Sequence, residues 1–333
     1  MASNLKYAVF GSGSWATAIV KMLCENLDEV GWYIREPSTL DHIVKEKHNP
    51  DYLSSVEFHT EQLKLSNDIN EIANYADVWV FVIPSAFIYK ELEKLNVNYS
   101  DKLIVSAVKG IMPESGLAVG EHFHDIYHVP IENICVIGGP CHAEEVAMER
   151  LSYLTIACAD ASKAEEVASK LSCHYIKTNI SDDIIGIEYA AMLKNIYAIA
   201  AGIAHGLGYG DNFQSILMSN AIREMKRFTK RMHKIKRNIN HSAYLGDLLV
   251  TGYSIFSRNR MFGNMIGKGY TVKSAQMEMS MVAEGYYATK SAYLLNQKSV
   301  KKSRTPIIDA VYAILYQGKN PKKVFKKLTD LLD

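Results

Sequence analysis

Short apolar runs alternate with helical patterns over the first 180 residues of the chain. The clearest runs are rich in β-branched and aromatic residues, as strands are. They cover 6–10, 30–34, 78–83, 103–108, 134–138 and 153–159, and 174–178 is expected to be the last strand. Several are continuously apolar, which is typical of parallel strands buried on both faces of a sheet. This alternation predicts an α/β fold with a Rossmann-type, doubly wound sheet.

From residue 181 onward the strand pattern gives way to helical periods. Ser181, Asp182 and Asp183 supply a cap and an acidic first turn for a helix. Helical patterns then cover 183–204, 211–232, 242–250, 275–295 and 305–315, with a short amphipathic tail near 320–332. A chain of 333 residues is too long for one ordinary core. We therefore expect two domains, an α/β domain over 1–180 and an all-helical domain over 181–333.

The helix predicted from residue 184 to 204 is almost wholly apolar, with Lys194 and Asn195 at its centre. A helix that is apolar on all sides must be buried, and burying an unpaired ammonium is costly. The residues one turn away carry no carboxylate, and Glu188 lies on a different side of the helix. Lys194 therefore needs a partner from elsewhere in the fold or from a ligand. Asp247 is the best candidate, although a helix-capping role fits Asp247 equally well.

Composition and charge narrow the class of protein. Hydrophobic residues make up 48% of the chain and charged residues 22%, and 37 basic against 36 acidic residues leave a net charge of +1. The total charge thus shows no bias toward nucleic acid or a membrane surface. Lys194 and Asn195 interrupt the longest apolar run, and the first residues lead directly into a strand, so we expect no membrane span and no signal peptide. These features predict a cytoplasmic protein.

One segment departs from this balance. Residues 223–237 hold eight basic side chains and one acidic. A solvated helix end is the interpretation that the overall charge favours, and a polyanion-binding patch is the alternative.

The cysteines and histidines indicate no metal site. The five cysteines include no Cys-x-x-Cys pair and are expected to be reduced thiols. His122, His124 and His128 lie close together in the sequence, but no set of cysteines or carboxylates completes a ligand shell.

A glycine motif follows the first strand directly and opens a helix. Gly11 allows a tight turn, Gly13 lets the backbone approach a pyrophosphate, and Ala16 allows close packing of helix on strand. This context predicts dinucleotide binding. The second predicted strand ends at Arg35 and Glu36, and a guanidinium suits a 2′-phosphate. Arg35 therefore favours NADP over NAD, with use of both left open.

Two further polar groups occur where ligands are bound in folds of this class. Lys109 follows the carboxyl end of a predicted strand, and open α/β sheets bind ligands at that edge. Arg258, Asn259 and Arg260 combine guanidinium forks with a neutral donor, which suits a small phosphate dianion.

Eight motifs in order along the chain resemble the bacterial NAD(P)-dependent glycerol-3-phosphate dehydrogenases, and the resemblance covers essentially the whole sequence. They begin at Gly11, Val105, Gly138, Leu193, Gly206, Gly246, Ser257 and Val282. The resemblance implies reversible reduction of dihydroxyacetone phosphate to sn-glycerol 3-phosphate with NADPH or NADH, supplying phospholipid synthesis. It also implies a homodimer.

The resemblance assigns roles to individual residues. Lys194 would donate and accept the proton, with Lys109 and Asp247 completing the catalytic group. The cofactor would contact Gly11, Gly13, Ser14, Trp15, Arg35, Lys109, Ala143, Arg258, Val282 and Glu284. The substrate would contact Lys109, Gly139, Cys141, Lys194, Asn195, Asp247, Ser257, Arg258 and Asn259.

Two positions depart from the family pattern, and two other functions remain open. Cys141 stands where the family usually has Ser or Thr, and Val108 where it usually has Thr. A related β-hydroxyacid or 6-phosphogluconate-type dehydrogenase would share the architecture and an inward lysine. A non-catalytic dinucleotide sensor would need the glycine turn but no buried lysine.

Overall fold

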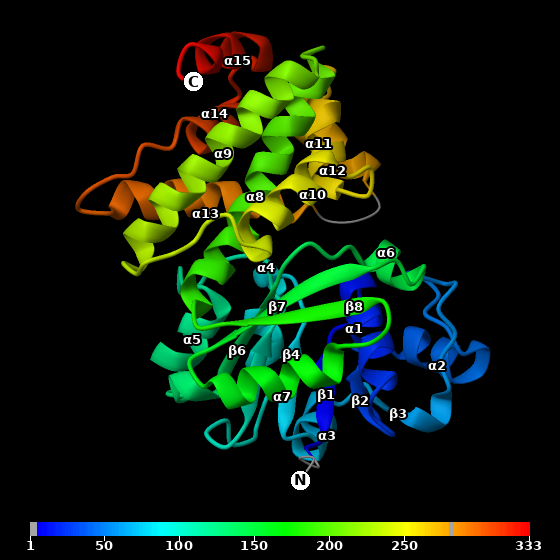
Figure 1. Cartoon of the computed structure of the whole chain (residues 1–333). Coiled ribbons are helices and arrows are strands. Elements are labelled where there is room, and N and C mark those ends of the chain that lie inside the picture. Colours follow the sequence, from blue (N-terminus) through cyan, green and yellow to red (C-terminus); the bar gives the residue numbers. More distant parts are fainter. Residues whose placement is uncertain (1–4, 280–282) are drawn as a thin grey trace. The chain divides into compact units, whose positions relative to one another are not determined.

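The computed structural model describes residues 5–279 and 283–333 of the chain (Figure 1). They form two compact units. The sheet unit comprises 1–108 and 117–188, and the helical unit comprises 109–116 and 189–333. The segment after the fifth strand, which begins with Lys109, thus belongs with the helices rather than with the sheet.

The described residues of the sheet unit form eight strands in one sheet. The strands are β1 (Tyr7–Phe10), β2 (Val30–Tyr33), β3 (Leu63–Ser66), β4 (Val78–Phe81), β5 (Leu103–Ser106), β6 (Ile134–Gly138), β7 (Ser152–Cys158) and β8 (Ile176–Ser181). The helices between them are α1 (Ser14–Cys24), α2 (Pro37–Glu46), α3 (Ile69–Tyr75), α4 (Ser85–Leu92), α5 (Val119–Asp125), α6 (Ala143–Ala147) and α7 (Ala161–Leu171). Single 3₁₀ turns lie at Thr60–Gln62 and Ile131–Asn133.

The strand order is β3-β2-β1-β4-β5-β6-β7-β8, which is the doubly wound arrangement that the sequence predicted. One pairing differs from the expected parallel pattern, because β6 and β7 run antiparallel, with Cys135 opposite Cys158. A strand buried on both faces is apolar whether it runs parallel or antiparallel to its neighbours. The apolar pattern of β7 therefore could not indicate the direction in which the strand runs. The polar strand β3 was not predicted.

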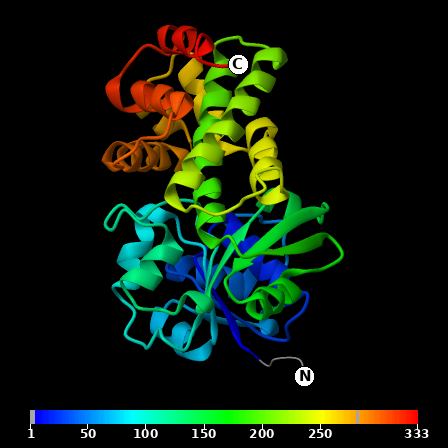
Figure 2. The ribbon, with the colours of Figure 1, turned by 60° about the vertical axis from the view of Figure 1, so that its left-hand side comes forward.

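Figure 2 shows the helical unit from a second direction. The described residues of this unit form eight α-helices. They are α8 (Ile184–Gly206), which begins in the sheet unit, α9 (Asp211–Met232), α10 (Asp247–Tyr253), α11 (Arg258–Gly267), α12 (Val272–Glu278), α13 (Glu284–Lys298), α14 (Pro306–Gln317) and α15 (Pro321–Thr329). A π-helical turn, Ser242–Gly246, leads into α10. No strand follows Ser181 in the part of the chain that the structure describes.

Two predicted helices need correction, and one helix was missed. The helix expected over 242–250 is the π-turn followed by α10, and the one expected over 275–295 is two helices, α12 and α13. Helix α11 was not predicted, because Asn259, Gly263 and Gly267 weaken its helical pattern. Its glycines are explained by its packing, described below.

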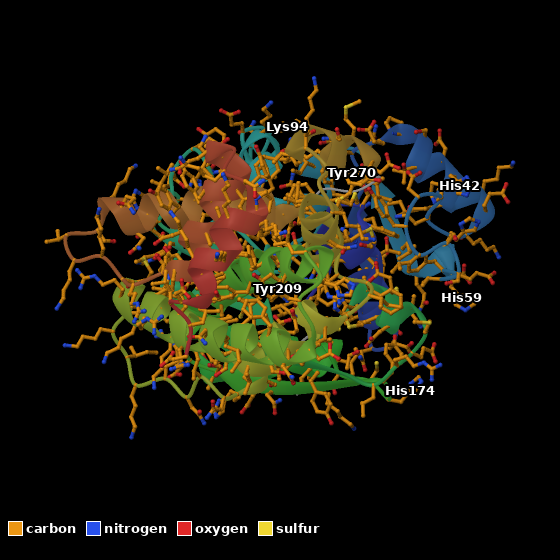
Figure 3. The ribbon with its side chains drawn as sticks, turned by 90° about the horizontal axis from the view of Figure 1, so that it is seen from above. His42, His59, Lys94, His174, Tyr209 and Tyr270 are labelled. Carbon is orange, nitrogen blue, oxygen red and sulfur yellow. The ribbon has the colours of Figure 1, made fainter. Side chains whose placement is uncertain are left out.

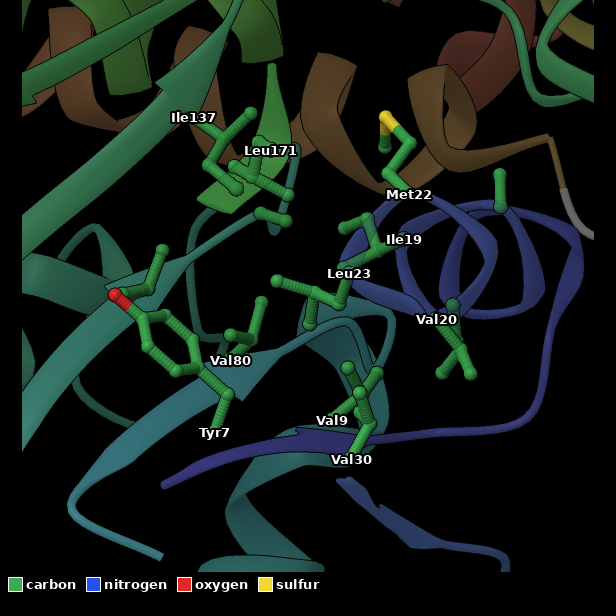
Figure 4. Close-up of a cluster of buried hydrophobic side chains, with 14 of the residues drawn as sticks. Tyr7, Val9, Ile19, Val20, Met22, Leu23, Val30, Val80, Ile137 and Leu171 are labelled. Carbon is green, nitrogen blue, oxygen red and sulfur yellow. The ribbon is translucent and has the colours of Figure 1, made fainter. Parts of the chain in front are cut away.

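One apolar cluster of the sheet unit packs around α1. Side chains such as those of His59 and His174 lie at the exterior of the unit (Figure 3). Inside, α1 contributes Ile19, Met22 and Leu23, which pack with residues of β1, β2 and β4 (Figure 4). This packing holds the amino end of α1 against the end of β1, so it positions the glycine turn between them.

Candidate active site

The turn between β1 and α1 has the geometry of a phosphate-binding loop. Gly11 has φ +129°, and a Cβ added to it would lie 3.1 Å from the Val82 carbonyl oxygen, so only glycine fits. Gly13 is the N-cap of α1, and no described atom lies within 4 Å of a Cβ added there. Space is therefore open beside Gly13, at the helix end whose dipole favours a bound anion. The turn fits a dinucleotide pyrophosphate.

Two side chains that are distant in sequence brace this turn. Trp32 Nε1 donates to the Gly11 carbonyl oxygen at 2.7 Å. Asn49 is fully buried, and its Nδ2 donates to the Ser12 carbonyl oxygen and to Thr17 Oγ1, both at 2.9 Å. Asn49 was not predicted, because nothing in the local sequence pattern shows that a residue 37 positions along the chain returns to the turn.

Arg35 lies directly after β2, with carboxylates beside it. Its Nη2 lies 2.8 Å from Glu36 Oε1, and its Nη1 lies 3.9 Å from Glu91 Oε1. Glu91 is buried and accepts hydrogen bonds from Tyr33 Oη at 2.7 Å and from Lys94 Nζ. The Arg35 side chain is 58% exposed and so can reach a ligand. The guanidinium suits a 2′-phosphate, and the Glu36 carboxylate suits ribose hydroxyls.

The remaining candidates of the sheet unit lie close to β6 and α1. Gly139 follows β6 with φ +112°, and a Cβ there would lie 2.8 Å from the Tyr153 carbonyl oxygen. Cys141 and Ala143, which follow it, are buried, as is Ser14 at the start of α1, while Trp15 is partly buried. Val282, also predicted to serve the cofactor, lies outside the described residues.

Lys194 is buried at the middle of α8 and forms an ion pair with Asp247. Its Nζ donates to Asp247 Oδ1, and the two side chains are only 6% and 3% exposed. Asp247 is the first residue of α10, whose N-cap is Gly246, so its carboxylate is a counter-charge rather than a cap. The lysine in the apolar helix thus has the partner that the sequence indicated.

Close packing of α8 against α11 fixes the position of Arg258 and Asn259. A Cβ added to Gly202 of α8 would lie 2.0 Å from the Arg260 carbonyl oxygen, and one added to Gly263 of α11 would lie 2.1 Å from the Ile199 carbonyl oxygen. The two backbones are therefore in direct contact, which only glycine permits. Arg258 and Asn259 form the first turn of α11, and the Ser257 side chain caps it by accepting from Arg260 N at 3.3 Å.

Helix α13 joins the same cluster at its first turn. The Gly285 backbone N–H donates to Asn259 Oδ1 at 2.9 Å. A Cβ added to Gly285 would lie 2.7 Å from the Asn195 carbonyl oxygen, so α13 approaches α8 closely. Asn195, Asn259 and Gly285 thus bring three helices together beside Lys194.

Glu284 connects the charged residues of this cluster. Burial raises the pKa of its carboxyl, and the positive charges of Lys109, Arg258 and Lys194 partly oppose that increase. Together with Asp247, the group contains three cations and two carboxylates. Its formal charge of one positive unit, with further neutral donors, suits a phosphorylated ligand. The family resemblance assigned Glu284 to the cofactor, and only the structure shows that it lies among these cations.

The predicted residues therefore fall into two sets. The sheet unit contains Gly11, Gly13, Ser14, Trp15, Arg35, Gly139, Cys141 and Ala143, and the helical unit contains Lys109, Lys194, Asn195, Asp247, Ser257, Arg258, Asn259 and Glu284. Within residues 5–279 and 283–333 no group of three or more His, Cys, Asp or Glu side chains could hold a metal ion.

Helix α8 is long and apolar enough to cross a membrane by length and composition alone, but 94% of its most apolar window is buried inside the protein.

Comparison with known families covers nearly all of the chain. Residues 6–165 match the N-terminal domain of NAD-dependent glycerol-3-phosphate dehydrogenase, and residues 183–326 match its C-terminal domain. The chain is 35% identical over 323 residues to the glycerol-3-phosphate dehydrogenase [NAD(P)+] of an Exiguobacterium strain, covering 96% of this chain and 94% of the relative. It is 34% identical over 325 residues to the Bacillus subtilis enzyme of the same name, covering 97% and 93%.

A solved structure shows the same architecture. The crystal structure of glycerol-3-phosphate dehydrogenase from Coxiella burnetii is similar with a TM-score of 0.89 and 27% identity, and the match covers 98% of each chain.

Proposed function

The chain belongs to the NAD-dependent glycerol-3-phosphate dehydrogenase family, and we propose that it interconverts dihydroxyacetone phosphate and sn-glycerol 3-phosphate with NAD(P)H. The observation that carries this proposal is the buried Lys194–Asp247 pair, in a cluster that also holds the cations Lys109 and Arg258. The sheet unit would bind the dinucleotide, and the helical unit, which includes Lys109, would hold the substrate phosphate and the reacting carbonyl. The product would supply phospholipid synthesis in the cytoplasm.

Bound nicotinamide would supply or accept the hydride, and the protein would handle the proton and the charge. Reduction of a carbonyl places negative charge on its oxygen. A buried ammonium such as that of Lys194 stabilises this charge and can donate the proton. Both charges are shielded from water, which strengthens their interaction. Asp247 therefore holds the ammonium of Lys194 in one position. In the reverse direction Lys194 would take up the proton of the alcohol.

The phosphate would be held at the first turn of α11. Arg258 offers a guanidinium fork, and Asn259 is fixed by its hydrogen bond to Gly285. Lys109 would add a third positive charge beside the substrate, and the family resemblance assigns Cys141, Gly139, Asn195 and Ser257 to substrate contacts. Holding the phosphate in this way orients the carbonyl for the reaction.

For the cofactor, we propose a preference for NADPH that is moderate rather than strict. Arg35 favours a 2′-phosphate, whereas Glu36 engages the same guanidinium and could accept from a ribose hydroxyl. The homodimer implied by the family resemblance also remains a proposal, and size-exclusion chromatography with light scattering would test it.

A single assay tests the proposed reaction against its rivals. Oxidation of NADPH and NADH is followed with dihydroxyacetone phosphate, beside a panel of β-keto and β-hydroxy acids. We expect turnover with dihydroxyacetone phosphate. Turnover with a hydroxyacid alone would favour a β-hydroxyacid or 6-phosphogluconate-type dehydrogenase, and cofactor binding without any turnover would favour a dinucleotide sensor.

A further inference from the structure

The two compact units carry opposite charges, which the near-neutral total conceals. Residues 109–116 and 189–333 contain 24 basic and 9 acidic side chains, whereas residues 1–108 and 117–188 contain 13 basic and 27 acidic. With histidine neutral, the formal charges are +15 for the helical unit and −14 for the sheet unit. Charge asymmetry within a chain is a recognised sign of binding to a membrane or a nucleic acid.

The positive charge is concentrated on three segments of the helical unit. They are the C-terminal half of α9 with the residues after it, the connection between α13 and α14, and α15. We call their exposed cations the basic face: Arg223, Lys226, Arg227, Lys230, Arg231, Lys234, Lys236, Lys298, Lys301, Lys302, Arg304, Lys319, Lys322, Lys323, Lys326 and Lys327. The segment 223–237, whose charge is already conspicuous in the sequence, provides one of these three segments.

Hydrogen bonds and an ion pair join the three segments into one surface. Arg227 Nε donates to the Arg304 carbonyl oxygen at 3.2 Å, which joins α9 to the connection before α14. Arg304 Nη2 donates to the Leu331 carbonyl oxygen at 3.1 Å, which joins that connection to the end of α15. Arg223 lies 2.8 Å from a carboxylate oxygen of Asp333. The basic face is therefore continuous, and α9 and the red α15 can be followed in Figure 1.

Most cations of the basic face form no ion pair in the part of the chain that the structure describes. Within the described residues, Arg223 is the only member of the basic face in an ion pair. Opposite the exposed cations of α9, the side chains of Met225 and Phe228 are fully buried. The exposed carboxylates of Asp309, Asp330 and Asp333 lie near these segments, but sixteen cations far outnumber them. The cations repel one another, and an external anion would relieve that repulsion.

A groove between the connection, α14 and α15 adds apolar surface to the basic face. It has a volume of about 520 Å³. Its cations are Arg304, Lys319 and Lys327, it also contains the carboxyl of Asp309, and its apolar lining includes Ala310, Ala313, Val324, Leu328 and Leu331. A phosphate group with a short length of hydrocarbon would match this combination of cations and apolar side chains.

Aliphatic side chains exposed among the cations indicate which polyanion fits. Val300 is fully exposed between Lys298 and Lys301, and Leu331 is 49% exposed. Single-stranded nucleic acids are usually bound by aromatic side chains on which bases stack, whereas a lipid interface accepts aliphatic side chains between its headgroups. Phe325 and Leu328 of α15 are buried in the protein, so the attraction is mainly electrostatic.

We propose that the basic face docks this protein onto an anionic phospholipid surface. Each cation near such a surface strengthens binding by about fivefold, and salt screens the attraction. The negatively charged sheet unit is repelled, so docking involves the helical unit alone. This inference goes beyond the proposed reaction and does not depend on it.

Cosedimentation of the full chain with lipid vesicles tests the proposal. One set of vesicles contains phosphatidylcholine with a quarter of phosphatidylglycerol, and the other contains phosphatidylcholine only. We expect binding to the anionic vesicles at about 0.1 M NaCl, little binding to neutral ones, and release at about 0.5 M, where the screening length is much shorter.

Two triple variants with the same change in charge localise the surface. Lys322→Gln, Lys326→Gln and Lys327→Gln remove three cations of the basic face, whereas Lys177→Gln, Lys268→Gln and Lys273→Gln remove three exposed lysines elsewhere. We expect the first set to weaken vesicle binding at least about tenfold and the second to change it less than about twofold. Both should keep the melting temperature of the parent, because these side chains are exposed.

Several outcomes would overturn the proposal. They are no binding to anionic vesicles at the lower salt concentration, equal binding to neutral vesicles, or equal loss in both triple variants. Salt-sensitive binding of a short DNA duplex without binding to anionic vesicles would instead show that the basic face binds nucleic acid.

Discussion

Replacing Lys194 by methionine separates its structural role from its chemical role. The substitution keeps an unbranched side chain of similar length but removes the ammonium, and it leaves the Asp247 carboxylate buried without its partner. Because the two side chains are only 6% and 3% exposed, water cannot replace the lost interaction. Breaking a buried ion pair from one side costs about 3–5 kcal/mol, so the free energy of unfolding should fall by that amount.

Turnover should fall further than this loss of stability explains. A positioned proton donor contributes about 10²–10⁴-fold, and stabilisation of the carbonyl oxygen adds to that. We expect Lys194→Met to lose at least several hundred-fold in kcat under conditions where it is fully folded. Urea unfolding gives the stability, and NADPH oxidation with dihydroxyacetone phosphate gives the turnover.

The double variant Lys194→Met with Asp247→Asn completes the experiment. It removes both charges, so most of the lost stability should return, whereas turnover should stay low. Lys290→Met, which changes an exposed lysine of α13, is the matched control and should alter the unfolding free energy by less than about 0.5 kcal/mol. Turnover within tenfold of the parent in the single variant would refute the catalytic role. A double variant no more stable than the single one would refute the counter-charge role of Asp247.

Four further outcomes follow from the structure. Arg258→Ala should raise the Michaelis constant for dihydroxyacetone phosphate by about 10–100-fold through loss of a charged hydrogen bond, and an unchanged constant would contradict the phosphate role. Arg35→Ala should lower the ratio of kcat/KM for NADPH to that for NADH, and an unchanged ratio would refute the assignment. Asn49→Ala should raise the Michaelis constant for the cofactor and leave that for the substrate unchanged, because Asn49 braces the glycine turn; the reverse result would contradict this. Burial raises the pKa of Glu224 to about 8, although two backbone N–H groups of α14 favour its ionised form. The folded state therefore holds a proton that the unfolded chain releases, and the contribution of Glu224 to stability should fall from pH 5 to 8 by at most about 5 kcal/mol. Because burial also raises the pKa of Glu188 to about 8, Glu224→Gln should reduce, but not abolish, the dependence of the melting temperature on pH.

Patterns within single segments were sufficient to predict most elements. The apolar runs at β1, β2, β4, β5 and β6 and the helical periods of α8 and α9 were predicted within a few residues. The exceptions have local causes. Strand β3 is half-buried and polar, and α11 carries glycines that lower its intrinsic helical preference but let it approach α8.

The sequence predicted only part of the candidate site. Lys194 is conspicuous because it interrupts an apolar helix, and the glycine turn is conspicuous because it follows a strand. Asn49 and the position of Glu284 had no such signal, because each depends on contacts between segments far apart in the chain. Total charge was misleading in one respect, since it gave no indication that the two compact units differ so strongly in sign.

Sequence alone therefore determined the fold class, the family and the need of Lys194 for a counter-charge, because periodicity, turn chemistry and an isolated charge are properties of neighbouring residues. The tertiary structure decided the antiparallel pairing of β7, the inclusion of Lys109 in the helical unit and the pairing of Lys194 with Asp247. It also joined three lysine-rich and arginine-rich segments into one basic face. These are relations between distant segments, and only the packed backbone brings such segments together.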